Sequence, residues 1–312
     1  MQPPPEVAAE RTIDAALVRR LLAAQRPAAL ELSQASYESE LAALEIRRVA
    51  EGWDNVLLRV GARWLARVPR RAVAAELLRG ELRCLPALAP SLPLPVPAAA
   101  YVGRPEDFFP WPWALVPWIE GTPLGHALEL DHERVATQLG RFLGALHRLP
   151  LPADAPSNAM RGVPLRTRAP LLEERLARLR ALGEPLDEAR LRTRWREFAS
   201  QPEWPGPKVW CHGDLHPFNL LTRGGQLAAV LDWGDVHGGD PALDLASAWM
   251  ASPRARHSSL RAAYGAIDDT TWLRGQGWAV YYGVTLLDAG LRGAGPPYAS
   301  VGRRTLARAL AG

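Results

Sequence analysis

The residues best placed to do chemistry lie in one polar loop and the hairpin that follows it. Asp214 follows a short apolar run, Asn219 comes five residues later, and Asp232 ends a second apolar run. The glycine pair Gly224-Gly225 predicts a hairpin turn that brings Asp232 back beside Asn219. We therefore expect two carboxylates and one carboxamide to converge at one point.

Such a set suits phosphoryl transfer. Mg²⁺ prefers hard oxygen ligands, which Asn219 and Asp232 can supply. Asp214 would then orient the attacking hydroxyl and accept its proton. A competing interpretation is a hydrolase that depends on Zn²⁺ or Mn²⁺. In that case the metal ligands would be His212, Asp214, His216 and Asp232.

The wider pattern is more specific than these three residues. It reads His-Gly-Asp-Leu-His-Pro-x-Asn from His212, Asp-Trp-Gly from Asp232, and Gly-Asp-Pro-Ala-Leu-Asp-Leu from Gly239. It resembles the aminoglycoside phosphotransferase family over roughly residues 45–290. The resemblance implies an α+β, two-lobed, protein-kinase-like fold with a small antiparallel-sheet N-lobe and a mainly helical C-lobe. It also implies Mg²⁺ and a phosphoryl donor, ATP or GTP.

The resemblance assigns roles around the catalytic loop. Asp214 and His216 are the expected catalytic residues, and His216 would bind the phosphate or the substrate unless its role is structural. Asp244 would brace the loop. His212 precedes a glycine turn, so we expect it to support the loop backbone. Asp240 is a candidate cap for the helix that begins near Pro241.

The expected nucleotide-binding residues lie earlier in the chain. By the resemblance, Gly52 to Asn55 match a shortened phosphate loop, although a simple tight turn is the alternative. Arg67 occupies the position of the phosphate-pairing lysine, and alternation along the strand turns it away from Ala66 and Val68. Its carboxylate partner would be Glu81 rather than Glu76.

By the resemblance, the segment from Val116 to Leu124 matches a hinge in which backbone groups two residues apart pair with the nucleobase. The Pro117 carbonyl and the Ile119 N–H lie two residues apart, and Pro117 has no N–H to offer. Trp118, between them, would either cover the base or pack internally. Arg70, after the strand of the phosphate-binding arginine, is expected to be solvated.

The periodicity of apolar residues predicts two domains. Residues 1–119 would form the nucleotide-binding lobe and residues 120–312 the catalytic and substrate lobe. Residues 1–11 are expected to be disordered. The strands are expected within residues 46–68, 99–102, 113–119 and 208–233. The helices are expected near residues 13–26, 70–88, 131–147, 170–182, 187–199, 241–251, 257–265, 270–291 and 299–311.

The composition bears on partners and location. Net charge is +4, and all but one of the 37 basic residues are arginine, with Lys208 the only lysine. The arginines are scattered without a nucleic-acid-reading motif, so we expect no nucleic-acid partner. We also expect no membrane span, two buried free thiols at Cys84 and Cys211, a cytoplasmic location, and a monomer or weak dimer.

The acceptor is expected to be a small hydroxyl compound: an aminoglycoside or other antibiotic, a sugar or a metabolite. Seven residues separate Asp232 from Asp240, too few for a peptide-docking segment. A polycationic acceptor would need clustered carboxylates. The candidates, each also interpretable as a surface charge, are Asp235, Asp268, Asp269, Asp288, Glu173 and Glu174. A stripe that would face the acceptor or the core comprises Trp278, Tyr281, Tyr282 and Asp288. A non-catalytic nucleotide-binding module is the alternative from another class.

Overall fold

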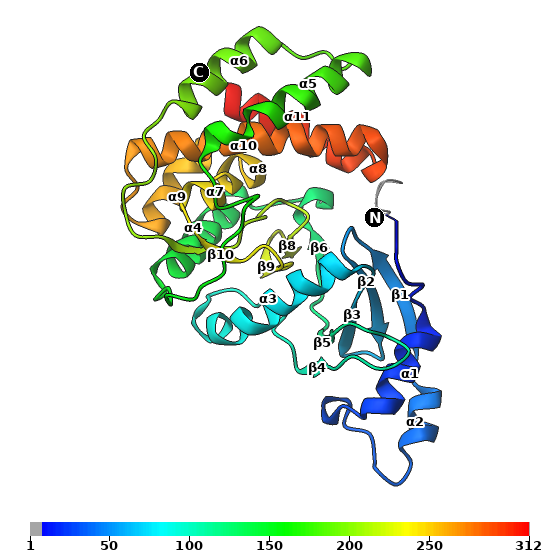
Figure 1. Ribbon diagram of the computed structural model, residues 1–312. Helices are drawn as coiled ribbons and strands as arrows, with labels where there is room; N and C mark the ends of the chain where they lie inside the picture. Colours follow the sequence, from blue (N-terminus) through cyan, green and yellow to red (C-terminus); the bar gives the residue numbers. More distant parts are fainter. Residues whose placement is uncertain (1–7, 312) are drawn as a thin grey trace. The chain divides into compact units, whose positions relative to one another are not determined.

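The computed structural model describes residues 8–311 (Figure 1). The disorder predicted for residues 1–11 therefore falls mostly on residues 1–7, outside the described chain. The chain divides into two compact units. The first runs to Ala89 and also contains Pro97–Ile119, whereas the second contains Pro90–Val96 and everything from Glu120 onward. The predicted α+β class is confirmed, with a small antiparallel sheet in the first unit and mostly helices in the second.

The first unit is built on a five-stranded antiparallel sheet. Short runs rich in β-branched and aromatic residues, separated by turns, explain why these segments form strands. In their order across the sheet, the strands are β1 (Ile46–Glu51), β2 (Asn55–Val60), β3 (Trp64–Pro69), β5 (Trp113–Pro117) and β4 (Tyr101–Gly103).

Helices cover both faces of this sheet. The apolar residues of α1 (Ala15–Gln25) and α2 (Tyr37–Ala43) share one core cluster with one face of the sheet. A smaller cluster joins α3 (Ala72–Leu88) to the other face. Asp14 caps α1 by accepting a hydrogen bond from the Leu17 N–H at 2.8 Å. The short helix α2 was not predicted, and neither was the 3-10 turn before it, at 28–30.

The alternation of side chains along β3 sets the direction of the buried Arg67. Ala66 and Val68 belong to the core cluster under α1 and α2. Successive side chains of a strand point to opposite faces, so Arg67 points toward the α3 face. The predicted direction of the Arg67 side chain, away from Ala66 and Val68, is confirmed.

The predicted boundary after residue 119 is wrong for one segment. Pro90–Val96, placed with the N-lobe by the prediction, belongs to the second unit. A backbone hydrogen bond explains this, because the N–H of Val230 donates to the carbonyl oxygen of Pro95 at 3.0 Å. A proline-rich segment carries no periodicity that would reveal such a contact.

The second unit contains two small antiparallel sheets. One pairs β6, β8 and β9, and the other pairs β7 with β10. The strands are β6 (Thr122–Pro123), β7 (Val209–Cys211), β8 (Leu220–Arg223), β9 (Gln226–Val230) and β10 (His237–Gly239). The predicted hairpin is β8–β9, and its turn residues Gly224 and Gly225 both have positive φ. Strand β10 was not predicted.

Helices make up the rest of the second unit. They are α4 (His132–Arg148), α5 (Ala169–Ala181), α6 (Glu188–Ala199), α7 (Ala242–Leu245), α8 (Ser247–Ala251), α9 (His257–Tyr264), α10 (Asp269–Ala289) and α11 (Pro296–Leu310). Short turns of 3-10 helix precede α4, α5 and α9, at 124–126, 165–168 and 254–256, and a single 3-10 turn follows α3 at 89–91. A π-helical turn at 290–294 joins α10 to α11.

Two helix predictions need correction. The single helix expected over 241–251 is two short helices, α7 and α8, that meet at Ala246. The last helix begins at Pro296 rather than at residue 299, because proline is well accommodated in the first turn of a helix. Within residues 8–311, every helix is too short or too polar to span a lipid bilayer.

Candidate active site

The loop between β7 and β8 has a backbone that requires glycine at its start. Gly213 has φ +90°, which favours glycine. A Cβ atom there would also lie 2.4 Å from the carbonyl oxygen of Asp235. This close approach brings the loop against the segment after β9, which also carries Asp232.

Hydrogen bonds within the loop bring Asp214 and Asn219 together. The His216 N–H donates to the Asp214 carbonyl oxygen at 2.9 Å, and the Asn219 N–H donates to the His216 carbonyl oxygen at 2.9 Å. The Nδ2 of Asn219 also donates to the Asp214 carbonyl oxygen, at 2.9 Å. Since Nδ2 is used in this way, the other branch of the carboxamide, Oδ1, is the one that can ligate a cation.

His212 ties the loop to the end of the hairpin. Its side chain is buried, and its Nδ1 accepts a hydrogen bond from the Asp214 N–H at 3.2 Å. Its Nε2 therefore carries the proton and donates to the Leu231 carbonyl oxygen at 2.9 Å. Both ring nitrogens are engaged with backbone, which favours a supporting role over metal ligation.

Asp232 stands next to this connection. The Leu231 N–H donates to the Asn219 carbonyl oxygen at 2.8 Å, so Asp232 directly follows the residue paired with Asn219. Asp232 is exposed and has φ +60°, a left-handed conformation uncommon for residues other than glycine. Such backbone strain concentrates at functional sites. Its position beside Asn219 suits a pair of oxygen ligands for Mg²⁺.

The carboxylate of Asp214 has an arginine partner that the sequence analysis missed. Nη2 of Arg161 lies 2.8 Å from Oδ1 of Asp214, and Nε2 of His216 lies 3.5 Å from Oδ2. Burial alone would raise the pKa of Asp214, but Arg161 and then the histidines hold that pKa below its usual value. Asp214 is therefore ionised at neutral pH.

His216 is neutral at the same pH. Burial lowers its pKa, and this outweighs the opposite effect of Asp214. Its Nδ1 accepts a hydrogen bond from the Phe218 N–H at 3.2 Å, so Nε2 carries the proton. A neutral histidine with its N–H beside Asp214 can donate to an oxygen of a phosphate or of an acceptor.

Arg161 is held by several groups of the second unit. Its Nε lies 3.5 Å from Oδ2 of Asp235, and its Nη1 donates to the Tyr282 hydroxyl at 3.3 Å. The Tyr282 hydroxyl in turn donates to the Gly213 carbonyl oxygen at 2.7 Å. These carboxylates and Tyr282 raise the pKa of Arg161 although burial opposes them. The guanidinium therefore links the catalytic loop to helix α10.

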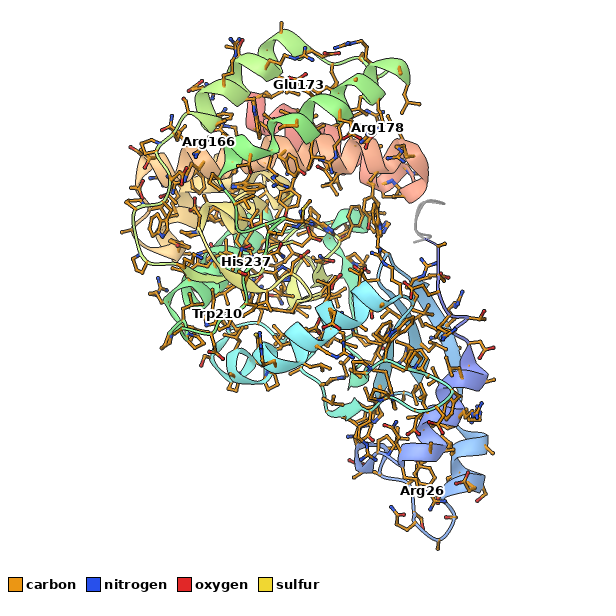
Figure 2. All side chains as sticks on the ribbon, in the orientation of Figure 1. Arg26, Arg166, Glu173, Arg178, Trp210 and His237 are labelled. Carbon is orange, nitrogen blue, oxygen red and sulfur yellow. The ribbon has the colours of Figure 1, made fainter. Side chains whose placement is uncertain are left out.

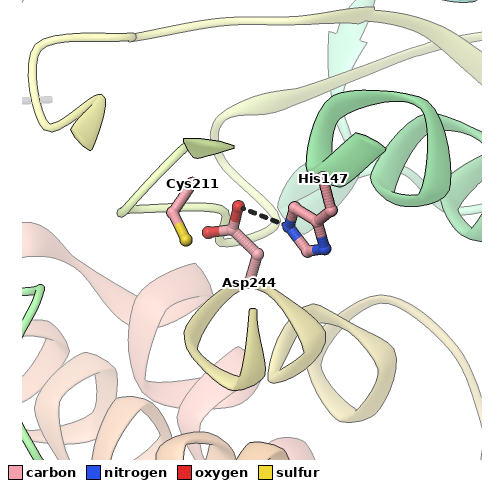
Figure 3. A group of neighbouring side chains, drawn as sticks. All are labelled: His147, Cys211 and Asp244. Atoms are coloured by element: carbon pink, nitrogen blue, oxygen red, sulfur yellow. Dashed lines mark hydrogen bonds and ion pairs between the residues drawn. The ribbon is translucent and has the colours of Figure 1, made fainter. Parts of the chain in front are cut away.

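Asp244 lies under the loop (Figure 3). Its carboxylate accepts hydrogen bonds from the N–H groups of His212 at 2.7 Å and Gly213 at 3.0 Å. Nε2 of His147 lies 3.3 Å from Oδ2 of Asp244. Asp240 is separate: it accepts from the Ala242 N–H at 2.9 Å, at the start of α7.

The third residue of Figure 3 is Cys211, whose Sγ lies with ligand atoms of His147 and Asp244 within 4.8 Å. These residue types can bind a metal. Here, however, both oxygens of Asp244 already accept hydrogen bonds from the loop, and burial raises the pKa of the Cys211 thiol well above its usual value. We therefore interpret this cluster as a brace of the catalytic loop.

In the first unit, the structure brings Arg67 and Glu81 together as a buried ion pair. The two residues are only 6% and 2% exposed. The rejected candidate, Glu76, is exposed and pairs with Arg79 instead. A buried ion pair costs desolvation, so its retention between β3 and α3 fits a functional position.

The predicted phosphate loop joins β1 to β2, and the Gly52 N–H donates to the Asn55 carbonyl oxygen at 2.9 Å. The prediction that Arg70 is solvated is wrong. Arg70 is 5% exposed, with Nη2 3.0 Å from a carboxylate oxygen of Glu51 and Nη1 donating to the Gly52 carbonyl oxygen at 3.3 Å. Arg71 pairs with the Asp54 carboxylate at 2.6 Å. These two arginines hold the loop against the end of β3.

The predicted hinge follows the end of β5. Leu115 pairs with β4, whereas the Trp118 N–H donates to the Arg63 carbonyl oxygen at the β3 side, at 2.8 Å. Backbone groups of successive residues point to opposite edges, so the Pro117 carbonyl and the Ile119 N–H point to the side opposite the Trp118 N–H, which is the β4 side. Strand β4 pairs with residues up to Leu115. This arrangement suits two backbone contacts to a nucleobase.

The candidate acceptor carboxylates all have partners. Asp288 is buried and lies 2.8 Å from Nη2 of Arg178, which also pairs with Glu174. Arg178 lies on α5 (Figure 2). The Glu173 carboxylate lies 2.8 Å from Arg192. Among the others, Asp235 pairs with Arg161, Asp269 pairs with Arg261, and Asp268 caps α10. The predicted stripe is buried, and its member Tyr282 is the one that reaches the catalytic loop.

A small antiparallel sheet, a mainly helical second unit and the site formed by Asp214, Asn219 and Asp232 are typical of the kinase-like class. Comparison with known proteins gives the family. The sequence matches the phosphotransferase enzyme family over residues 45–280, so the chain belongs to that family. The predicted class, a small-molecule phosphotransferase, is confirmed at the level of family and fold.

Similar folds occur among solved structures. A GDP complex of a mutant aminoglycoside 2′-phosphotransferase-IIIa superposes with a TM-score of 0.67 at 24% identity, over 95% of this chain and 97% of that chain. Macrolide 2′-phosphotransferase MphH from Brachybacterium faecium gives 0.56 at 24% identity, over 86% and 95%. Uncharacterized protein YcbJ from Bacillus subtilis (strain 168) is 38% identical over 53 residues, and the chain spans only 17% of its length.

Proposed function

We propose that this protein transfers a phosphoryl group from ATP or GTP, with Mg²⁺, to a hydroxyl of a small molecule. The observation that carries the proposal is the hydrogen-bonded loop in which Asp214 and Asn219 meet, joined through Leu231 to Asp232. In the proposed roles, Asp214 orients the attacking hydroxyl and accepts its proton. Asn219 and Asp232 would hold Mg²⁺, which neutralises developing charge on the phosphates.

The supporting roles divide between the two units. In the first unit, Arg67, held by Glu81, would contact the phosphates, and the Gly52–Asn55 loop would cover them. The Pro117 carbonyl and the Ile119 N–H would pair with the nucleobase. We propose this unit as the nucleotide-binding part and the second unit as the catalytic part. GDP and ADP complexes of the similar structures support a purine nucleotide as donor.

Within the second unit, His216 would donate its Nε2–H to a phosphate or acceptor oxygen. His212 and Asp244 would keep the loop in place. A small acceptor is favoured because β10 and α7 follow Asp232 closely and leave no peptide-docking segment. Both cysteines are free and buried, which suits the cytoplasm as the compartment.

The experiment is a measurement of ADP or GDP release against a panel of acceptors. The panel contains antibiotics, sugars, choline-like amines and hydroxylated metabolites, each assayed with both nucleotides. The proposal predicts that at least one acceptor raises release above background and that chelation of Mg²⁺ abolishes the increase. A binding module would bind nucleotide and give no such increase. A metal-dependent hydrolase would act without nucleotide and stop with a zinc chelator.

A further inference from the structure

Arg161 lies beside Asp214, the residue proposed as the base. Its guanidinium contacts the carboxylate of Asp214 at 2.8 Å and approaches that of Asp235 at 3.5 Å. Their backbone segments are in close contact, because a Cβ atom on Gly213, next to Asp214, would lie 2.4 Å from the carbonyl oxygen of Asp235. The Arg161 side chain is 22% exposed, so part of it remains accessible to a small molecule.

The arginine is fixed in place rather than loosely paired. Oδ1 of Asn158 accepts hydrogen bonds from the backbone N–H groups of Met160 at 2.9 Å and Arg161 at 3.0 Å. Nδ2 of the same asparagine donates to Oδ1 of Asp235 at 2.7 Å. Asn158 thus holds both the backbone of Arg161 and one of its carboxylate partners, which sets the guanidinium between the two acids.

The neighbouring helices α5 and α10 place an arginine beside Tyr281 and carry a buried acid, Asp288, that is already paired. On α5, Arg175 donates to the Tyr281 hydroxyl at 2.8 Å, and its guanidinium lies 5.0 Å from the centre of that ring. Tyr281 precedes Tyr282, the tyrosine that contacts Arg161. Asp288, further along α10, is already paired with Arg178. Arg161 and Arg178 therefore already pair with three of the carboxylates that could attract a cation, Asp214, Asp235 and Asp288.

We propose that Arg161 is a specificity-determining residue that selects acceptors without positive charge near the reacting hydroxyl. The inference rests on the proposed function and deepens it. A polycation would have to compete with a fixed guanidinium for Asp214 and Asp235, and would be repelled by that guanidinium at close range. A neutral or anionic acceptor meets neither obstacle.

The test uses one pair of probes that share their hydroxyl groups and differ in charge: kanamycin and its fully N-acetylated form. Their dissociation constants are measured by calorimetry at low salt on the protein saturated with a non-hydrolysable Mg-nucleotide. The variants are Arg161→Met, which removes the charge, and Arg161→Lys, which keeps it. The matched control is Arg166→Met, because Arg166 is exposed in the same segment and pairs with Glu203 (Figure 2).

The wild-type protein should bind the N-acetylated probe at least as tightly as kanamycin. Arg161→Met should shift the ratio of the two constants at least tenfold toward kanamycin, equivalent to about 1.4 kcal/mol. Arg161→Lys should keep the wild-type ratio, and Arg166→Met should not change it. The proposal is overturned by a wild-type preference for kanamycin, by an unchanged ratio in Arg161→Met, or by kanamycin binding that stays undetectable in that variant.

Failure of the proposed function has a different signature. It would appear as a wild-type protein that binds no Mg-nucleotide, or that binds it and transfers phosphate to no acceptor. The charge test compares the ratio of the two probes' dissociation constants in the wild type with that in each variant, and it does not depend on turnover. Thermal unfolding midpoints of the three variants, measured first, identify any loss of folding.

Discussion

The hydroxyl of Tyr282 joins Arg161 to the backbone of the catalytic loop. It accepts a hydrogen bond from Nη1 of Arg161 at 3.3 Å and donates one to the Gly213 carbonyl oxygen at 2.7 Å. Gly213 adjoins Asp214, so one phenol positions both the carboxylate and its counter-ion. This relationship connects the long helix α10 to the residue proposed as the base.

Tyr282→Phe should therefore lower kcat about tenfold with little change in KM for nucleotide. The loss corresponds to about 1.4 kcal/mol, near the upper end of the net contribution of one buried hydrogen bond. Steady-state kinetics with the best acceptor of the panel measures it. Tyr281→Phe is the matched control, because it removes a hydroxyl from the adjacent residue of α10 that contacts Arg175 instead. An equal loss of kcat in both variants would contradict the special role of Tyr282.

The buried pair of the first unit leads to a second prediction. Glu81→Gln removes the charge that holds Arg67, so the dissociation constant for nucleotide should rise about tenfold. Titration with a fluorescent nucleotide analogue measures the change. Glu76→Gln is the control on the same helix, because Glu76 pairs only with exposed Arg79. Unchanged nucleotide affinity in Glu81→Gln would contradict the proposed contact between Arg67 and the phosphates.

Sequence patterns predicted this site unevenly. Asp214, Asn219 and Asp232 lie within one short segment, where loop and hairpin lengths fix their convergence, so local reasoning could find them. Arg67 and Glu81 followed from their positions in the family resemblance, and strand alternation gave the direction of Arg67. The pair lies on a strand and a helix, where the geometry repeats from residue to residue.

Arg161 and Arg70 show where such reasoning fails. Arg161 lies in an irregular segment between α4 and α5, and its contact with Asp214 joins residues far apart in the chain. No periodicity marks such a contact. Arg70 directly follows a strand, a position typical of an exposed charge. Its ion pair with Glu51, at the end of a different strand, cannot be inferred from the local sequence. The strand β10 has only three residues, two of them glycine, and carries little strand propensity.

Stability should depend on pH through His257. Burial, with help from Arg254 and Arg308, lowers its pKa to about 4 in the folded protein, although its Nε2 lies 3.2 Å from the Ala248 carbonyl oxygen. The unfolded chain, with a histidine pKa of about 6.5, binds the proton more readily. Stability is therefore complete above pH 6.5 and is lost as the pH falls from 6.5 toward 4.

Between pH 7 and pH 5 this group should cost about 2 kcal/mol of unfolding free energy. Urea unfolding of the wild type and of His257→Gln at both pH values measures it, since glutamine can still donate to the carbonyl oxygen but does not titrate. The variant should lose less stability over this interval than the wild type. Equal losses in the two proteins would show that the pKa of His257 does not differ between the folded and unfolded chains.

The central claim concerns Asp214, and one measurement tests it most directly. Asp214→Asn keeps the size of the side chain and the backbone contacts of the loop but removes the proton acceptor. With the acceptor identified by the panel, single-turnover phosphoryl transfer should fall by at least about 10³-fold. The dissociation constant for Mg-nucleotide should stay within about threefold of the wild-type value, since Asn219 and Asp232 remain. Transfer at the wild-type rate in Asp214→Asn would contradict the account.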